Sequence, residues 1–180
     1  MTARNINELA AAIHEAAVAK GFWDVEDAEK KHLAKMISEL GEVVQADRAG
    51  VMYEIERDGG KPEGVVAEFA DFAMMALDWL EMVSKYDHCE RLIECCCELD
   101  KPHNGLMCKL HAYELVFMLV RNFRCFYRWD MQNHTAVAVM YEMVSVILCW
   151  LKYRGYDLWE VIEEKLAYNE SRPKLHGRAY

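Results

Sequence analysis

The chain has 180 residues, 53% of them hydrophobic, and a formal net charge of −9. This length suffices for one domain with a sizeable core. The acidic balance argues against a non-specific nucleic-acid binder, because phosphate backbones would be repelled. With only three prolines and little β-branched alternation, the composition favours an all-α protein.

The cysteines and the apolar segments indicate a cellular compartment. The seven cysteines include a run at 95–97, and neither an odd total nor adjacent cysteines suits a disulfide framework. We therefore expect a reduced, intracellular protein. No signal-peptide core is seen at the N-terminus. The run 136–151 contains Glu142 and is too short to span a bilayer, which predicts a soluble, cytoplasmic protein with no membrane partner.

Helical spacing of apolar residues predicts seven helices. Gly21 and Gly155 end the first and sixth helices, Pro62 fits the first turn of the third, and Asp157 caps the last. The predicted ranges are 4–20, 28–48, 62–84, 87–99, 106–128, 134–153 and 158–168. We predict that residues 1–180 form a single all-α domain.

The sequence contains two pairs of carboxylates, Glu39 with Glu42 and Glu68 with Asp71. Within each pair the two residues are three positions apart, and each pair lies in an apolar helical segment. Positions i and i+3 share one helix face, with Cβ atoms roughly 5–6 Å apart. Two such helices packed face to face would gather four acids, whose mutual repulsion a hard divalent cation relieves. This pattern predicts a Mg²⁺ site, with Mn²⁺ as a substitute. The alternative is that the acids face solvent at helix edges.

The C-terminal segment is locally basic. Lys165 and Asn169 are four residues apart and share a face of the last helix, and Arg172 follows. Pro173 and Gly177 come after the helix and predict a segment that orders only over bound phosphates. Cations there would hold a pyrophosphate leaving group.

A candidate base pocket is formed by Trp23 and His14, which stand near the acids in the expected fold. Each also has an ordinary structural role as its alternative, Trp23 as a plug of the core. The sequence does not identify which base or sugar such a pocket would prefer.

Two helical hairpins suggest an internal duplication. The segment 39–79 and the segment 114–151 share one plan, and aligning their tryptophans places Glu142 at the position of Asp71. An apolar residue, Phe117 or Met118, stands near the place of Glu42. The alternative is that any two amphipathic hairpins look alike. The chain would divide into a metal-binding half (about 1–85), a helical insertion or degenerate repeat (about 86–155) and a phosphate-binding tail (about 156–180).

Three motifs resemble one enzyme superfamily. The pattern Ser-Glu-Leu-Gly-Glu at 38–42, followed by Glu-x-x-Asp at 68–71, resembles the metal-binding signature of the all-α nucleoside triphosphate pyrophosphohydrolases, MazG-like and dimeric dUTPase proteins. The tail from Glu164 to Gly177 and the N-terminal residues 13–24 are also similar to MazG-like segments. The resemblance covers roughly 6–81 and 143–180 and departs from the family at Lys35, where an apolar residue is common.

The resemblance implies Mg²⁺-dependent cleavage of a nucleoside triphosphate to a monophosphate and pyrophosphate. Carried over by position, the metal ligands would be Glu39, Glu42, Glu68 and Asp71. Lys165 and Asn169 would contact phosphates, with Arg172 next in the same register. Glu39 and Glu42 are the candidate catalytic residues, and Glu42 is our choice to orient the attacking water, although the sequence does not select among the four acids.

Three other interpretations compete with this one. A ferritin-like di-iron protein needs Glu-x-x-His on two helices, and the motif occurs within a predicted helix only at 29–32. A non-catalytic helical interaction protein would use the acids as solvated faces. A third is a hydrolase of the same superfamily with another substrate, such as phosphoribosyl-ATP. In every case the apolar helices at 106–153 predict an oligomer, with a homodimer favoured.

Overall fold

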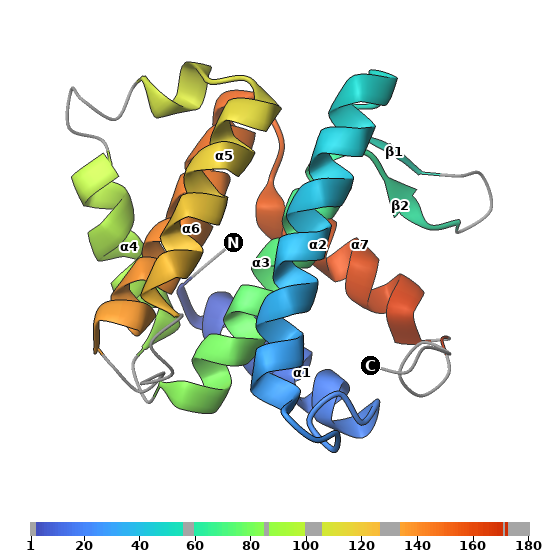
Figure 1. The fold of residues 1–180 in the computed structure, drawn as a ribbon, viewed down its shortest axis with the longest axis vertical. Coiled ribbons are helices and arrows are strands. Elements are labelled where there is room, and N and C mark those ends of the chain that lie inside the picture. Colours follow the sequence, from blue (N-terminus) through green and yellow to red (C-terminus); the bar gives the residue numbers. More distant parts are fainter. Residues whose placement is uncertain are drawn as a thin grey trace.

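The computed structural model describes residues 3–55, 60–84, 87–99, 106–126, 134–170 and 172. These residues form an all-α fold of seven α-helices with one two-stranded sheet (Figure 1). The helices are α1 (Ala3–Ala19), α2 (Ala28–Ala49), α3 (Val65–Val83), α4 (His88–Leu99), α5 (Ala112–Asn122), α6 (His134–Tyr153) and α7 (Leu158–Glu170). The strands are β1 (Glu54–Ile55) and β2 (Pro62–Glu63), and the 3₁₀ turns are η1 (Met107–Lys109) and η2 (Phe123–Cys125).

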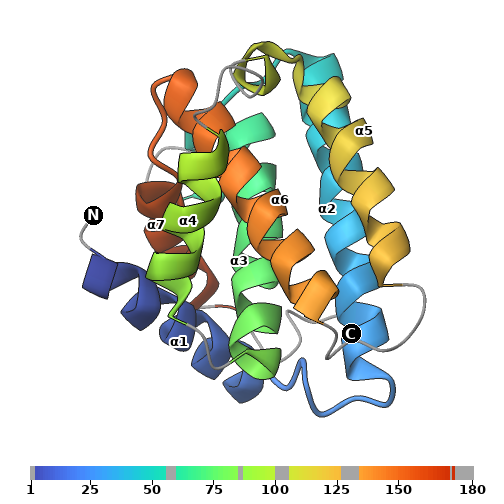
Figure 2. The ribbon, with the colours of Figure 1, turned by 90° about the vertical axis from the view of Figure 1, so that its left-hand side faces the viewer.

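Helix α3 lies at the centre of the molecule. Helices α1, α2, α6 and α7 all pack against it, while α5 packs on α2 and α4 packs on α6. Figure 2 shows α1 lying across the lower ends of the other helices, with α3 enclosed behind α4 and α6. Of the 19 residues of α3, 14 are buried, as expected for a predominantly apolar helix at the centre of a bundle. Two of its buried residues, Glu68 and Asp78, are nevertheless acids.

The third helix begins later than the sequence predicts. Pro62 does not start a helix but lies in β2, where it pairs with Ile55 of β1 in an antiparallel register. Gly64 follows at φ 102°, a conformation that L side chains rarely adopt. A Cβ at Gly64 would lie 2.9 Å from the backbone carbonyl of Met52. Helix α3 therefore starts at Val65, after this tight passage.

The helix predicted at 106–128 is wrong as one continuous element. It is replaced by η1, α5 and η2, and residues 127–128 lie outside the described part of the chain. The break has a local cause, because His111 is extended and forms a capping box with Glu114 that starts α5 anew. The backbone amide of His111 donates to Glu114 Oε2 at 2.8 Å. The remaining predicted helices are confirmed, with ends shifted by at most two residues.

The two proposed repeats share one hydrogen-bonding pattern. Trp79 at the end of α3 donates to Glu29 Oε1 in the first turn of α2, at 3.0 Å. Trp150 near the end of α6 donates to the carbonyl of Leu110 just before α5, at 2.9 Å. Each tryptophan thus ties the end of one hairpin to its beginning. Glu142 is exposed on α6, and the duplication stays a prediction.

Helix α6 is long and apolar enough to cross a membrane, and among the described residues it is the one helix with this property. The expectation that this segment is too short therefore needs correction, since the helix has 20 residues. Its most apolar window is 61% buried inside the fold, as in the core helix of a soluble protein. The cytoplasmic location stays a prediction.

Candidate metal centre

Three carboxylates meet where α2 packs on α3. Glu39 and Glu42 project from α2 and Glu68 from α3, and one oxygen of each lies within 4.8 Å of the others. The i, i+3 spacing on α2 and the first turn of α3 bring them together. Glu39 is 7% exposed and Glu68 is 4% exposed, whereas Glu42 is half-buried. Such burial is unusual for acids unless they are paired or bind a cation.

Burial sets the electrostatics of this cluster. It raises the pKa of Glu39 to about 7, with the neighbouring charge of Asp71 adding to the effect. Burial also raises the pKa of Glu68 to about 7, although the ammonium of Lys165 works in the opposite direction. With no cation nearby, both acids therefore keep their protons up to a pH well above the usual range for a carboxyl group.

The cluster contains a buried oxygen whose hydrogen-bonding capacity is unused. Glu68 Oε2 is shielded from solvent and has no hydrogen-bond partner among the described residues. A carboxylate oxygen in this condition costs free energy unless a proton or a cation compensates it. Of the described carboxylates, Glu68 alone has such an oxygen.

The fourth predicted ligand, Asp71, lies beside the cluster but outside the three-oxygen group. Its carboxylate forms a salt bridge with Lys165 of α7, which is 1% exposed. The structure thus joins two residues that the sequence assigned to different tasks, a metal ligand and a phosphate-binding cation. Lys165 neutralises the charge of Asp71, and this pairing compensates the cost of burying the ammonium group.

A cleft of about 390 Å³ extends from the acids toward α1. Residues of α1, α2, α3 and α7 line it. The polar residues along it are Lys20, Lys31, His32, Lys35, Glu39, Glu42, Lys61, Asp71, Asp78, Lys165, Asn169, Glu170 and Arg172. A cleft of this size accepts a small organic ligand.

All three predicted phosphate-binding residues line this cleft: Lys165 and Asn169 from α7, and Arg172 from just beyond its end. Arg172 Nη1 donates to Asn169 Oδ1 at 3.3 Å. Lys20, which directly follows α1, donates to the carbonyls of Glu170 and Arg172 and so fixes the end of α7. The expected ordering of the tail on phosphate concerns residues that, beyond Arg172, lie outside the described part of the chain.

The far end of the cleft is organised around Asp78. Its Oδ1 lies 2.7 Å from His14 Nδ1 and accepts a hydrogen bond from Trp23 Nε1 at 3.1 Å. Trp23 also stacks on His32 with ring centroids 4.9 Å apart. His14 and Trp23, the candidate base pocket, thus hold Asp78, whereas Asp78 and His32 line the cleft.

Sequence reasoning did not single out Asp78, although a signal was present. Asp78 stands seven residues after Asp71, two helical turns along the same face of α3. Burial raises its pKa to about 6, against the effect of its hydrogen bond with His14. Burial lowers the pKa of His32 to about 4.

The single Glu-x-x-His motif in a helix has other roles in the fold. Glu29 accepts the hydrogen bond of Trp79, and His32 Nε2 lies 2.8 Å from the carbonyl of Met75, to which it donates. Both side chains serve contacts within the bundle, which disfavours a di-iron site there.

Comparison with known proteins gives no assignment: no family model, curated protein or solved structure matches this chain. The chemistry of the site must therefore follow from its own side chains. These are three clustered carboxylates, one ion-paired acid and several cations in a cleft of ligand size.

Proposed function

We propose that this chain is a Mg²⁺-dependent nucleoside triphosphate pyrophosphohydrolase, which converts a (d)NTP and water to a (d)NMP and pyrophosphate. The observation that carries the proposal is the carboxylate cluster: it contains the unpartnered Glu68 Oε2, and its other two members, Glu39 and Glu42, line a cleft that several cations also line. A cluster of acids beside cations suits a substrate that brings both a divalent cation and negative charge.

The donor set fits a hard divalent cation. Each of the three carboxylates offers a hard oxygen, these oxygens lie within 4.8 Å of one another, and oxygen is the ligand type that Mg²⁺ takes. Glu39, Glu42 and Glu68 would hold the ion, and Mn²⁺ is an alternative. When bound, the ion would neutralise phosphate charge and lower the pKa of a bound water.

The remaining residues divide the work of binding and proton transfer. Glu42 is less buried than Glu39 and Glu68 and lines the cleft, so its carboxylate is the one best placed to accept a hydrogen bond from the attacking water. Asn169 and Arg172 would bind the pyrophosphate that leaves.

The sequence resemblance supports the same proposal. Its acid motifs lie in the cluster or beside it, and Lys165, Asn169 and Arg172 of its tail motif line the same cleft. The rival substrate phosphoribosyl-ATP remains within the proposed chemistry, because the cleft gives no direct contact that selects a base.

The test is a panel of nucleoside triphosphates and phosphoribosyl-ATP, scored for released pyrophosphate with Mg²⁺ and with EDTA. We expect Mg²⁺-dependent release that Glu68→Gln abolishes. Glu15→Gln, which changes an exposed glutamate on α1, is the matched control and should retain activity. Absence of pyrophosphate release across the whole panel would refute the proposal.

A second candidate function, a helical interaction protein, is favoured by the outer face of α5. Tyr113, Phe117 and Val120 are 51%, 71% and 41% exposed there and follow the i, i+4, i+7 spacing of one helix stripe. We infer that a second copy of the chain covers this stripe, as a homodimer. Sedimentation of Phe117→Asp should then show the 20.9 kDa monomer, whereas a monomeric wild-type protein at micromolar concentration would reject the dimer.

A further inference from the structure

The cleft face of α2 carries a second polar feature beyond the acids. Residues 28, 31, 32, 35, 39 and 42 all line the cleft, which is the i, i+3, i+4, i+7 pattern of one helix face. Lys35 stands one turn before Glu39, about 6 Å along the helix axis at 1.5 Å per residue. It therefore lies between the acid cluster and the Asp78 end of the cleft.

Lys35 differs from three other lysines of the cleft in what its ammonium group contacts. Lys165 pairs with Asp71, Lys61 lies 2.9 Å from Glu63, and Lys20 donates to backbone carbonyls. The ammonium of Lys35 instead stands 4.9 Å from the ring centroid of Phe22. Within the described part of the chain Lys35 has no ion pair or hydrogen bond, even with its i+4 neighbour Glu39.

The charge of Lys35 acts on the nearby carboxylates of Glu39 and Asp78, where burial raises the pKa and Lys35 lowers it, but among the described residues its ammonium donates a hydrogen bond to neither. The side chain is half-buried, so its three N–H donors are partly removed from water. The aromatic face of Phe22 attracts the ammonium but accepts no conventional hydrogen bond from it. Because Lys35 lines the cleft, a ligand bound there can supply the missing oxygen acceptors.

We propose that Lys35, supported by the ring of Phe22, binds a phosphate group of the substrate. This inference rests on the proposed function and adds to it a phosphate contact from α2, separate from those of α7. The phosphate has two chemical sources, the triphosphate itself or a further phosphate on the sugar. The second source would define the substrate as a nucleotide phosphorylated at both ends.

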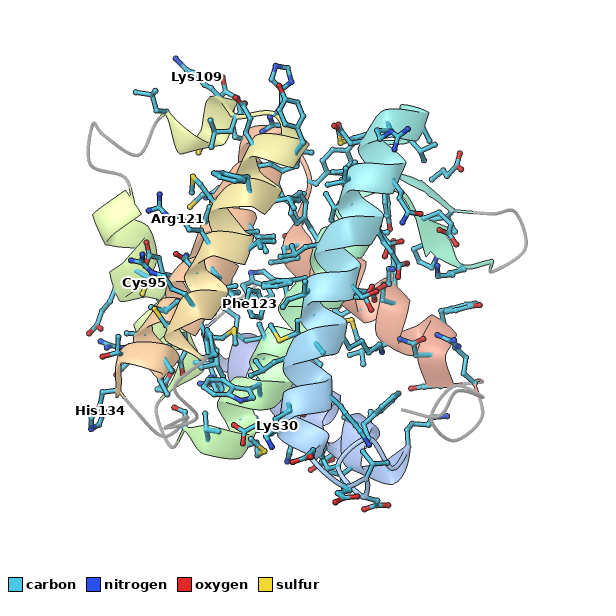
Figure 3. The ribbon with its side chains drawn as sticks, in the orientation of Figure 1. Lys30, Cys95, Lys109, Arg121, Phe123 and His134 are labelled. Atoms are coloured by element: carbon cyan, nitrogen blue, oxygen red, sulfur yellow. The ribbon has the colours of Figure 1, made fainter. Side chains whose placement is uncertain are left out.

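The test measures binding without turnover. Isothermal titration calorimetry with Mg²⁺ uses an α,β-methylene ATP analogue, which cannot be cleaved between those phosphates, and the same analogue carrying a 3′-phosphate. The variant is Lys35→Gln, and the matched control is Lys30→Gln, on the same helix but outside the cleft lining (Figure 3). Lys35→Arg retains the charge and should retain binding, and thermal melting confirms that each variant folds.

We expect Lys35→Gln to raise Kd about tenfold or more, as for the loss of a charge-assisted hydrogen bond. A rise with both analogues assigns the contact to the triphosphate, and a rise with the 3′-phosphorylated analogue alone assigns it to the second phosphate. The inference is overturned if Lys35→Gln matches Lys30→Gln with both analogues. Wild-type binding without any pyrophosphate release from the substrate panel would instead refute the proposed function and leave the Lys35 contact standing. If the wild type binds neither analogue, the inference about Lys35 fails, whereas the proposed function is judged by the substrate panel.

Discussion

Replacing Glu39 by glutamine should stabilise the metal-free protein while removing its activity. Burial raises the pKa of Glu39 from 4.5 to about 7 and leaves the residue 7% exposed. At about 1.4 kcal/mol for each pH unit, this rise corresponds to roughly 3 kcal/mol against the charged form in the folded state. Glu39→Gln removes the charge and keeps the shape.

The sign of the pH dependence follows from linkage. Between pH 4.5 and 7 the folded protein holds a proton on Glu39 that the unfolded chain has released. The free energy of unfolding therefore falls as pH rises through this window, and the loss is complete above pH 7. The stabilisation by Glu39→Gln should be near zero at pH 4.5 and about 1–3 kcal/mol at pH 8, because the new amide also needs partners.

The assay is urea unfolding of wild type, Glu39→Gln and the control Glu15→Gln at pH 4.5 and 8, with EDTA and with Mg²⁺. Mg²⁺ at one hundred times its Kd should stabilise the wild type by about 2.7 kcal/mol and Glu39→Gln by much less. If Glu39→Gln is instead less stable than wild type at pH 8 in EDTA, Glu39 serves the fold and the reasoning fails.

Three further predictions follow from other contacts. Glu68→Gln should lose turnover completely but keep or gain thermal stability in EDTA; a fall of many degrees in Tm would contradict this. Lys20→Met should release the end of α7 and raise KM severalfold with little change in kcat, while Lys20→Arg keeps the wild-type values; equal KM in both variants would count against that role. The lowered pKa of His32 makes stability rise between pH 4 and 6.5, and the raised pKa of Asp78 makes it fall between pH 3.8 and 6, so the two slopes largely cancel. His32→Gln removes the rising contribution and should therefore steepen the fall in stability between pH 4 and 6 by up to about 3 kcal/mol relative to wild type in urea unfolding; an unchanged slope would argue against a buried, neutral His32.

Helix geometry explains why much of the candidate site is visible in the sequence. An i, i+3 pair shares a helix face wherever that helix lies, so Glu39 with Glu42 was predictable from spacing alone. The apolar segments around the pairs predicted that their helices would pack closely, and α2 and α3 do so. Local periodicity likewise fixed the extent of α6, which begins and ends at the predicted residues.

Contacts between residues far apart in the sequence could not be predicted from helical spacing and local periodicity. The salt bridge between Lys165 and Asp71 joins residues 94 positions apart, and no local pattern records it. The late start of α3 depends on the backbone of Met52 passing close to Gly64, which is also a tertiary fact. The partnership of His14 with Asp78 is of the same kind, since it links α1 to α3.

The charge balance of the cluster leads to a final prediction about protons. Lys165 compensates Asp71, so Glu39, Glu42 and Glu68 are left to share whatever cation binds. With the pKa of Glu39 and of Glu68 both near 7, each carries a proton about half of the time at pH 7, and ligation requires those protons to leave. Titration of Mg²⁺ at pH 7 in buffers of different ionisation enthalpy should therefore report release of about one proton, falling toward zero at pH 8.5. A binding enthalpy that is independent of the buffer at pH 7 would show that these acids are already ionised, and the burial argument for the site would be lost.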